Sequence, residues 1–218
     1  ATNGDKNKAV ILYFANMKIA QAFHPLLSSF EVILRNQLHY ALAHHFSDGS
    51  WIINQKNGFM VASSLTHINK RTKKQVTNKY LLTEVQKAEK NISDRGVKVT
   101  AGRVIAEQTL GFWNSFYEVH HYMLLSGVPC TIFKKLPSGY GRKQVNDVIT
   151  QVRELRNRIN HNEPICFVNK KCDFSYARKM YRLISEFLSW IDPEIMPSLK
   201  EVDKVLKTID KEEQKQKI

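Results

Sequence analysis

The feature that most constrains how this chain can fold is the spacing of its apolar residues, which recur at steps of three and four. That spacing places them on one face of an α-helix. Glycine occurs nine times and proline six times, and no proline lies between Pro25 and Pro129. The chain is therefore predicted to be all-α, and its 218 residues are enough to bury a substantial core.

Breaks in the apolar pattern give the expected order of the helices. They are predicted over about 7–21, then from Pro25 in a first turn to an end at Asp48-Gly49, and over about 72–91, 99–125, 142–161 and 174–191. Gly111 should kink the fourth of these helices. The capping-box spacing from Ser198 to Glu201 predicts the start of a last helix.

Two segments lack a helical pattern. Residues 49–71 should form an irregular connection with short helical turns, and residues 127–141 should form a loop. We expect one helical domain over 1–192, followed by a C-terminal helical extension and charged tail over 193–218.

The charge of the chain favours a polyanionic partner. Lys and Arg number 33 against 20 Asp and Glu, which gives a net charge of +13. Nucleic acid and anionic membrane surfaces are the usual partners of such a protein. No apolar run approaches the roughly eighteen residues of a membrane span, and the polar start ATNGDKNK lacks the apolar stretch of a secretory signal.

The cysteines point to a reducing compartment. Cys130, Cys166 and Cys172 are odd in number and have no CxxC spacing, so they predict neither a disulfide framework nor a zinc site. We expect a cytoplasmic protein with no membrane partner and no cofactor.

The segment ELRNRINHNEPI, residues 154–165, lies where a predicted helix gives way to a proline. On a helical wheel of about 100° per residue, Asn157 and His161 share a face turned away from the apolar stripe. Arg156 lies at the edge of the apolar stripe. One interpretation is a solvated histidine that helps to cap the helix. The other interpretation is a catalytic site.

RNA carries its own nucleophile, the 2′-hydroxyl, so its cleavage needs a group that transfers protons near neutral pH and a cation for the charge on phosphorus. Histidine and arginine supply both without a metal. The products would be a 2′,3′-cyclic phosphate and a 5′-hydroxyl. Because one histidine is poorly suited to be base and acid at once, a homodimer that joins two sets in one cleft is predicted.

The geometry of an ideal helix leaves one question open. Arg156 and His161 lie about 140° apart on it. Their convergence on one phosphate needs a distorted helix end, the long reach of arginine, or a contribution from the second copy.

LRNRINHNEPI, residues 155–165, resembles the RxxxxH motif of HEPN-superfamily proteins, in particular the LRN-xxx-HNEP form of the Abi-like (abortive-infection) family. Three further segments fit that family in order: PLLSSFEVILRNQLHYAL (25–42), WII (51–53) and IAEQTLGFWNSFYE (105–118). The resemblance covers about residues 8–190. It implies a HEPN-type helical bundle with additional helices, usually dimeric, and a metal-independent endoribonuclease of phage defence or a toxin system.

By this resemblance, Arg156 and His161 are the catalytic pair, and Asn157 orients one of them. The early helix contributes Glu31, Arg35 and Asn36, which the resemblance places near the motif. The alternative for Glu31 and Arg35 is a simple helical ion pair.

Contact with RNA is expected from basic residues beside the motif helix, with a strong dependence on salt. The candidates are Lys134, Lys135, Arg142, Lys143 and Arg158. A solvated lysine run is the alternative. Phe133 and Tyr140 are candidates for stacking on unpaired bases, or for anchoring the loop.

The adjacent histidine pairs, 44–45 and 120–121, are predicted to be structural, because neighbouring side chains on a helix point about 100° apart and no carboxylate lies at ligand spacing. Two other functions stay open. One is a non-catalytic module that holds a structured, antitoxin-like RNA; the other is a HEPN protein paired with a nucleotidyltransferase. An RNA or protein antitoxin is a further possible partner.

Overall fold

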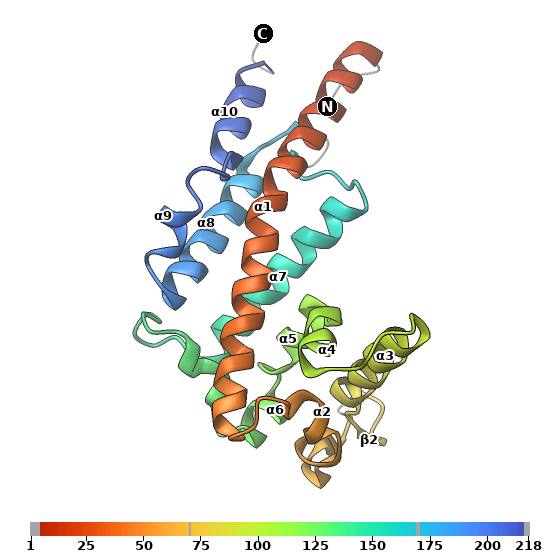
Figure 1. Cartoon of the computed structure of the whole chain (residues 1–218). Helices are drawn as coiled ribbons and strands as arrows, with labels where there is room; N and C mark the ends of the chain where they lie inside the picture. The colour runs from red at the N-terminus through yellow and green to blue at the C-terminus, as the bar shows by residue number, and fades with distance from the viewer. Residues whose placement is uncertain (1–4, 70, 169–170, 216–218) are drawn as a thin grey trace. The chain divides into compact units, whose positions relative to one another are not determined.

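The computed structural model of the chain describes residues 5–69, 71–168 and 171–215. Over these residues the fold is all-α, as the apolar spacing predicts, with two short antiparallel hairpins added (Figure 1). The chain forms two compact units: unit 1 comprises 1–32, 133–138 and 147–218, and unit 2 comprises 33–132 and 139–146. The described part of 193–218 belongs to unit 1, and the division at residue 192 stays a prediction. No described helix is long and apolar enough to cross a membrane.

Unit 1 is built around the first part of a long helix, α1 (Lys6–His45). Its other elements are most of α7 (Arg142–Asn160), β3 (Phe167–Val168), β4 (Lys171–Cys172), α8 (Ser175–Ile191), α9 (Ile195–Ser198) and α10 (Val205–Lys215). Phe187 of α8 lies at the centre of its core, with ring centroids 4.9 Å from Phe30 and 5.1 Å from Phe133. The prediction of helices at 142–161 and 174–191 is confirmed within about one residue, because both carry continuous apolar faces.

The prediction of separate helices on either side of Pro25 is wrong, since α1 runs through the proline. A proline inside a helix removes one hydrogen bond and costs about 3 kcal/mol. Phe23, Leu26 and Leu27, the apolar residues around it, are all buried, which offsets that cost.

Unit 2 contains the end of α1 and most of the short elements. They are α2 (Trp51–Asn54), three 3-10 turns (Gln55–Asn57, Phe59–Val61 and Ser63–Leu65), β1 (Thr66–Ile68), β2 (Gln75–Thr77), α3 (Tyr80–Asp94), α4 (Ala101–Glu107), α5 (Leu110–Ser115), α6 (Val119–Leu124) and a 3-10 turn (Val128–Ile132). The short turns after α2 confirm the irregular connection predicted for this segment.

An aromatic cluster holds unit 2 together. Trp51 is fully buried, with its ring 5.9 Å from Phe116 and 6.2 Å from Phe46. Its indole N–H donates to Nδ1 of His39 over 3.1 Å, which satisfies the one polar atom of the indole. Burial lowers the pKa of His39, in keeping with a ring that accepts this hydrogen bond while neutral.

The helix predicted over 72–91 begins only at Tyr80, because residues 75–77 pair with residues 66–68 as a hairpin. The β-branched residues of the two paired segments favour a strand conformation. The side-chain oxygen of Asn78 accepts the N–H of Tyr80 over 3.1 Å, an Asx turn directly before α3.

The long helix predicted over 99–125 is three short helices, so the expected kink at Gly111 is wrong. The breaks lie at Gln108, whose ψ of 137° is extended, and before Glu118, whose ψ is 148°. The side chain of Gln108 turns back to donate to Val104 O over 3.1 Å, which favours the break. Gly111 lies inside α5.

The capping box predicted at Ser198 is also wrong. The hydroxyl of Ser198 donates to Ile195 O over 2.7 Å at the end of α9. The last helix starts at Val205, whose N–H donates to the carboxylate of Asp203 over 3.1 Å.

Candidate functional site

The motif helix α7 ends in a defined turn. Asn162 adopts the left-handed conformation, with a φ of 54°. Its N–H donates to Ile159 O over 3.1 Å, and the N–H of Glu163 donates to Arg158 O over 2.8 Å. These two bonds form a Schellman motif, in which asparagine is one of the few residues that tolerate the left-handed position. Pro164 follows and prevents the helix from continuing.

His161 and Asn157 are exposed at this helix end. The N–H of His161 donates to Asn157 O over 2.9 Å, so helical hydrogen bonding continues through the histidine. Within the described part of the chain, neither side chain has a hydrogen bond or ion pair. Both nitrogens of the His161 ring are therefore open to a ligand.

Arg156 is held by a carboxylate from α1. Its Nε forms an ion pair with Oε1 of Glu31, and both side chains are only partly exposed, at 37% and 24%. The structure thus pairs Glu31 with the motif arginine. Because the contact uses Nε, the two terminal nitrogens of the guanidinium remain available for a phosphate.

The geometry of the turn bears on how Arg156 and His161 could reach the same phosphate. The helix is regular through Asn160, and the left-handed residue comes only after His161. The angle of about 140° between Arg156 and His161 therefore persists. A distorted helix end does not close it, which leaves the reach of arginine or a second copy.

Asn16 of α1 fastens the segment that follows the motif. Its Oδ1 accepts the buried N–H of Ile165 over 2.8 Å, and its Nδ2 donates to Glu163 O over 3.3 Å. Asn16 is buried, so this amide has no role on the surface. Its role was not predicted from the sequence, although an asparagine within the apolar run AVILYFANMKIA is a signal for a buried polar contact.

Cys166 follows this anchored segment and is buried. Burial, with a smaller effect of Cys172, raises the pKa of the Cys166 thiol to about 12. A thiol in that state is a poor nucleophile.

A groove of about 470 Å³ lies beside the motif turn. It is lined by Phe14, Met17, Lys18, Ala20, Gln21, His24, Ile159 and Asn162. His24 is exposed and lines this groove. Asn162, the residue after His161, lines the same groove. Sequence reasoning treated His24 only as the residue before a proline.

The remaining predicted residues are divided between the units. Arg35 and Asn36 lie in the unit 2 part of α1, where Arg35 is half-buried and Asn36 is exposed. Arg142, also in unit 2, donates to Tyr117 O over 2.7 Å, which gives it a structural contact, whereas Lys143 is exposed.

In unit 1, Lys134 and Lys135 are exposed, and the backbone N–H of Lys135 donates to Trp190 O over 2.8 Å. Arg158 lies over the ring of Tyr176, 5.3 Å from its centroid, and 3.9 Å from Glu163. Of the two aromatic candidates, Phe133 is buried and Tyr140 is exposed.

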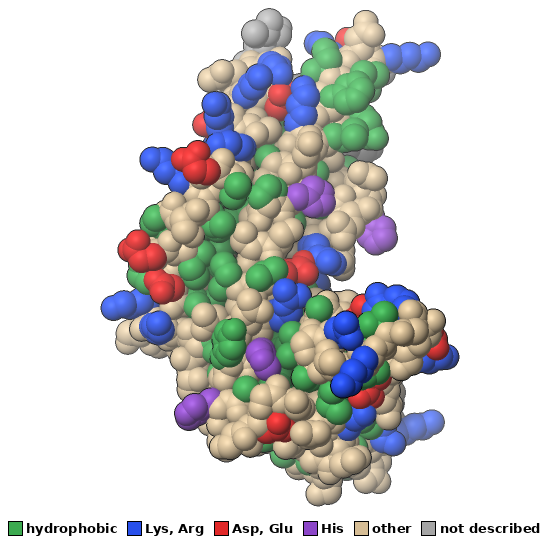
Figure 2. All heavy atoms as spheres, viewed as in Figure 1, with side chains coloured by type: hydrophobic (Ala, Val, Ile, Leu, Met, Phe, Trp, Pro, Cys, Tyr) green, Lys and Arg blue, Asp and Glu red, His purple; other side chains and the backbone are tan. Residues whose placement is uncertain are grey.

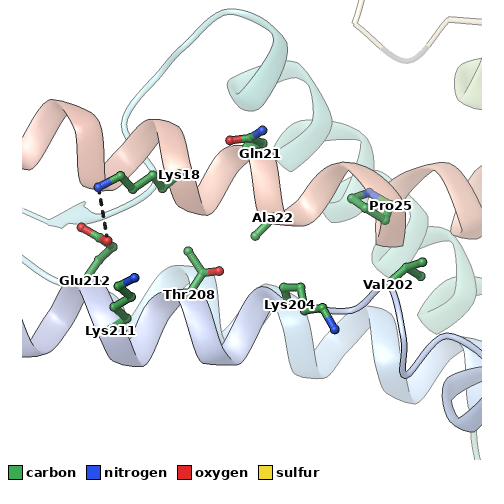
Figure 3. A pocket seen from close by; sticks show the side chains of 9 residues that line it. All are labelled: Lys18, Gln21, Ala22, Pro25, Val202, Lys204, Thr208, Lys211 and Glu212. Carbon is green, nitrogen blue, oxygen red and sulfur yellow. Dashed lines mark hydrogen bonds and ion pairs between the residues drawn. The ribbon is translucent and has the colours of Figure 1, made fainter.

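A second groove of unit 1, about 400 Å³ in volume, lies between α1 and α10 (Figure 3). The buried carboxylate of Glu212 accepts from Lys215 over 2.7 Å and from Lys18 over 3.5 Å. Burial opposes the ionisation of Glu212, but these two lysines outweigh it and lower the pKa of the carboxyl. The pair with Lys18 joins the last helix to α1, and we assign both ion pairs a structural role.

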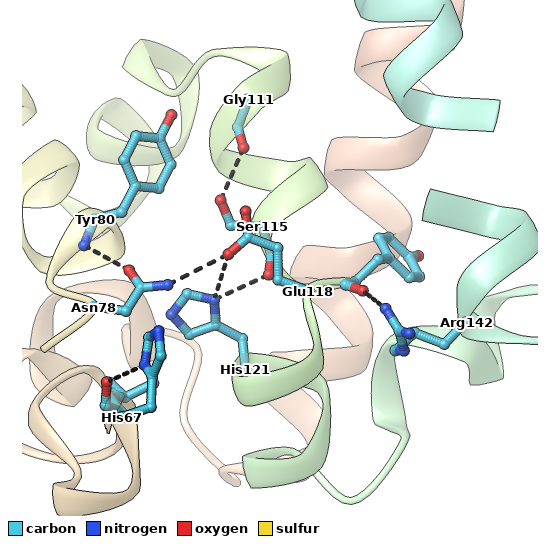
Figure 4. Close-up of polar contacts among 10 residues, drawn as sticks. His67, Asn78, Tyr80, Gly111, Ser115, Glu118, His121 and Arg142 are labelled. Carbon is cyan, nitrogen blue, oxygen red and sulfur yellow. Dashed lines mark hydrogen bonds and ion pairs between the residues drawn. The ribbon is translucent and has the colours of Figure 1, made fainter. Parts of the chain in front are cut away.

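A polar cluster in unit 2 contains His121 (Figure 4). Its Nδ1 donates to Ser115 O over 3.0 Å, and its side chain is fully buried, with no partner for Nε2 among the described residues. Burial lowers the pKa of His121 and outweighs the opposing effects of Ser115 and Glu118. In the described ranges, no three His, Cys, Asp or Glu side chains gather as metal ligands.

Exposed apolar side chains cover the N-terminal part of α1 (Figure 2). They are Val10, Ile11, Tyr13, Phe14 and Met17, each at least 40% exposed. Phe14 and Met17 also line the groove beside the motif turn. The apolar patch therefore continues into the candidate site.

Comparison of the chain with protein-family models, with curated proteins and with solved structures gave no match. The resemblance to HEPN proteins stays an expectation from the motif and from the order of the segments around it.

Proposed function

We propose that this chain is a metal-independent endoribonuclease of the Abi-like HEPN type, acting in the cytoplasm in an abortive-infection or toxin system. The observation that carries the proposal is the end of α7, where His161 is exposed with a ring free for a ligand and Arg156, five residues earlier on the same helix, is held through Nε alone. A helix cap requires neither feature. Proton transfer and phosphate binding require both.

The reaction assigns a role to each group. A ring nitrogen of His161 takes the proton of the 2′-hydroxyl, whose oxygen attacks the adjacent phosphorus. The bond from phosphorus to the 5′-oxygen breaks, and an imidazolium gives that oxygen a proton. The terminal nitrogens of Arg156 stabilise the negative charge that develops on the phosphate oxygens, and Asn157 orients one of the pair.

A homodimer supplies the second histidine that this reaction calls for. Large exposed apolar patches mark protein–protein contacts, and the patch over residues 10–17 borders the groove at the motif turn. A second copy seated on this face would bring two sets of Arg156 and His161 into one cleft. An antitoxin that covered the same face would block the site.

The test incubates the wild-type chain and His161→Ala with total RNA in EDTA and maps the fragment ends. His45→Ala is the matched control, because His45 is also an exposed histidine in the last turn of a helix. Cleavage that leaves 2′,3′-cyclic phosphates, lost in His161→Ala and kept in His45→Ala, is the expected result. Equal cleavage by the wild type and His161→Ala would contradict the proposal.

The second candidate is a non-catalytic module that holds a structured RNA. The Glu31 carboxylate favours it, because it partly neutralises the cation that catalysis needs. RNA binding by the wild type and His161→Ala alike, with no fragments from either, would favour this module over the nuclease.

A further inference from the structure

The strongest local excess of charge lies outside the motif, in the segment from Thr66 to Lys79. It holds five basic residues and no acidic one, in a chain whose net charge is +13. No Asp or Glu occurs anywhere from Gly49 to Thr83. This segment therefore supplies more than a third of the net charge of the protein from a small part of its length.

The segment folds as a hairpin in unit 2. Three residue pairs join β1 and β2, and the hydroxyls of Thr66 and Thr77 lie 2.9 Å apart across them. On the opposite face, His67 stacks on His120 of α6, with ring centroids 4.1 Å apart. The N–H of Asn78 donates to Leu65 O over 2.9 Å and closes the base. The hairpin is thus anchored on one face and open on the other.

The tip is held by Asn69. Its side-chain oxygen accepts the N–H groups of Arg71 and Thr72, each over 3.0 Å. Its backbone accepts from Lys73 over 2.8 Å and donates to Lys74 over 2.9 Å. Lys70 lies outside the described residues. These bonds fix the backbone that carries the basic side chains, which lowers the entropy lost when they bind a ligand.

The described cations of the hairpin have no acidic partner among the residues that the structure describes. Arg71, Lys73, Lys74 and Lys79 are exposed, and none forms an ion pair with any residue that the structure describes. In the same unit, two other cations do form ion pairs, Lys56 with Glu89 and Arg95 with Glu107. Unpaired cations release counterions from a polyanion when they bind it, which is the main source of affinity for nucleic acid.

We propose that the β1–β2 hairpin binds the phosphodiester backbone of RNA, at a place on the chain that the motif does not include. The open face offers threonine hydroxyls and the Gln75 amide beside the cations, groups that donate to phosphate oxygens. One exposed apolar residue, Ile68, is too few for insertion into a membrane. The contacts are to the backbone, so binding is independent of sequence. The choice of RNA over DNA rests on the proposed function.

The test measures binding of a single-stranded 2′-O-methyl RNA at several salt concentrations. This probe lacks the nucleophile, so binding is read whether or not the chain is a nuclease, and a failure here is distinct from a failure of catalysis. The variant is Arg71→Gln with Lys74→Gln. Its control, Lys87→Gln with Lys90→Gln, removes the same charge from exposed positions of α3, in the same unit.

The hairpin variant should bind at least about tenfold more weakly, and the slope of log K against log salt should fall by about 1.4, since each contact to a single strand contributes about 0.7. The α3 variant should keep the wild-type slope. Arg71→Lys with Lys74→Arg keeps the charge and should restore binding, which separates charge from misfolding.

Three results would overturn the proposal. One is an equal loss of affinity in the hairpin and α3 variants. Another is tighter binding of the hairpin to a DNA of the same sequence than to the RNA. The third is a variant that loses binding to phosphatidylserine vesicles while its RNA affinity is unchanged.

Discussion

The end of α7 and the β1–β2 hairpin are both polar, exposed and basic. They differ in whether their basic side chains are paired with a carboxylate. At the helix end, Arg156 is paired with Glu31, and His161 follows it by five residues with an exposed ring. In the hairpin, the described cations have no acidic partner, and the nearest histidine, His67, is stacked on another ring. A paired, oriented cation suits chemistry on one phosphate, and a set of unpaired cations suits binding to many. Under the two proposals, catalysis belongs to the helix end and affinity to the hairpin, so a substitution in one region should remove one property and leave the other.

The largest effect is expected at Arg156. Arg156→Ala should lower kcat for RNA cleavage by about 10²–10³-fold, the usual cost of removing one donor that stabilises a developing anion. Arg156→Lys should recover little, because lysine cannot form the planar two-point contact. Cleavage is followed as the rate of 2′,3′-cyclic phosphate formation.

Binding of the 2′-O-methyl RNA is the control for this prediction. Arg156→Ala should change it far less than the hairpin variant does. A loss of binding as large as that of the hairpin variant, with kcat unchanged, would remove the distinction between the two regions.

The next effect concerns stability at the helix end. Asn16→Ala leaves the buried N–H of Ile165 without its acceptor, which should lower the free energy of unfolding by about 1–3 kcal/mol. The measurement is urea unfolding, with Asn7→Ala, an exposed asparagine of the same helix, as the control.

RNA affinity at the hairpin should not change in Asn16→Ala, because the hairpin lies in the other unit. Equal stability of the two asparagine variants would show that the segment after the motif is not fastened by Asn16.

A smaller effect is expected from Glu31. Glu31→Gln keeps an oxygen that can accept from Arg156 but removes the charge that competes with phosphate. RNA affinity should rise a few-fold, with kcat within about twofold of the wild type. Glu31→Ala should gain the same affinity and lose kcat, because the guanidinium is no longer oriented.

Glu186→Gln removes a charge from an exposed carboxylate of the same unit and is the control. The two glutamine variants should differ in affinity. If they bind RNA equally well, net charge alone explains the gain, and the ion pair of Glu31 has no special part.

The smallest expected effect is on the pH dependence of stability, and it should differ between the buried His121 and the exposed His161. Burial lowers the pKa of His121 below its ordinary value of 6.5. The unfolded state therefore binds more protons below that pH, and stability should fall as the pH drops from 7.5 to 5.5. His121→Asn should be less stable at pH 7.5 but should lose less on acidification, as a thermal unfolding series at several pH values would measure.

His161→Ala is the matched variant at the exposed position. It leaves the buried ring of His121 and its bond to Ser115 O in place, so the loss of stability on acidification should remain. If His121→Asn also kept the full pH dependence, His121 would not be the group that titrates. His39, whose pKa burial also lowers, would then be the next to replace.

The sequence determined the features that depend on neighbours a few residues apart. The apolar spacing predicted the helical class and the bounds of α7 and α8, and the turn INHNEP ended the motif helix where the proline requires. Local spacing failed where a competing local interaction was stronger. Gln108 turned back onto its own helix, and Asp203, not Ser198, started the last one.

The tertiary structure decided which distant residues meet. Glu31 joins Arg156 across more than a hundred residues, and Asn16 joins Ile165 in the same way. The β1–β2 hairpin formed because two short segments pair with each other, which neither one signals alone. Periodicity and caps are set by bonds within one or two turns of the chain, so a sequence displays them. Contacts between distant segments depend on how the helices pack, and only the folded chain specifies that.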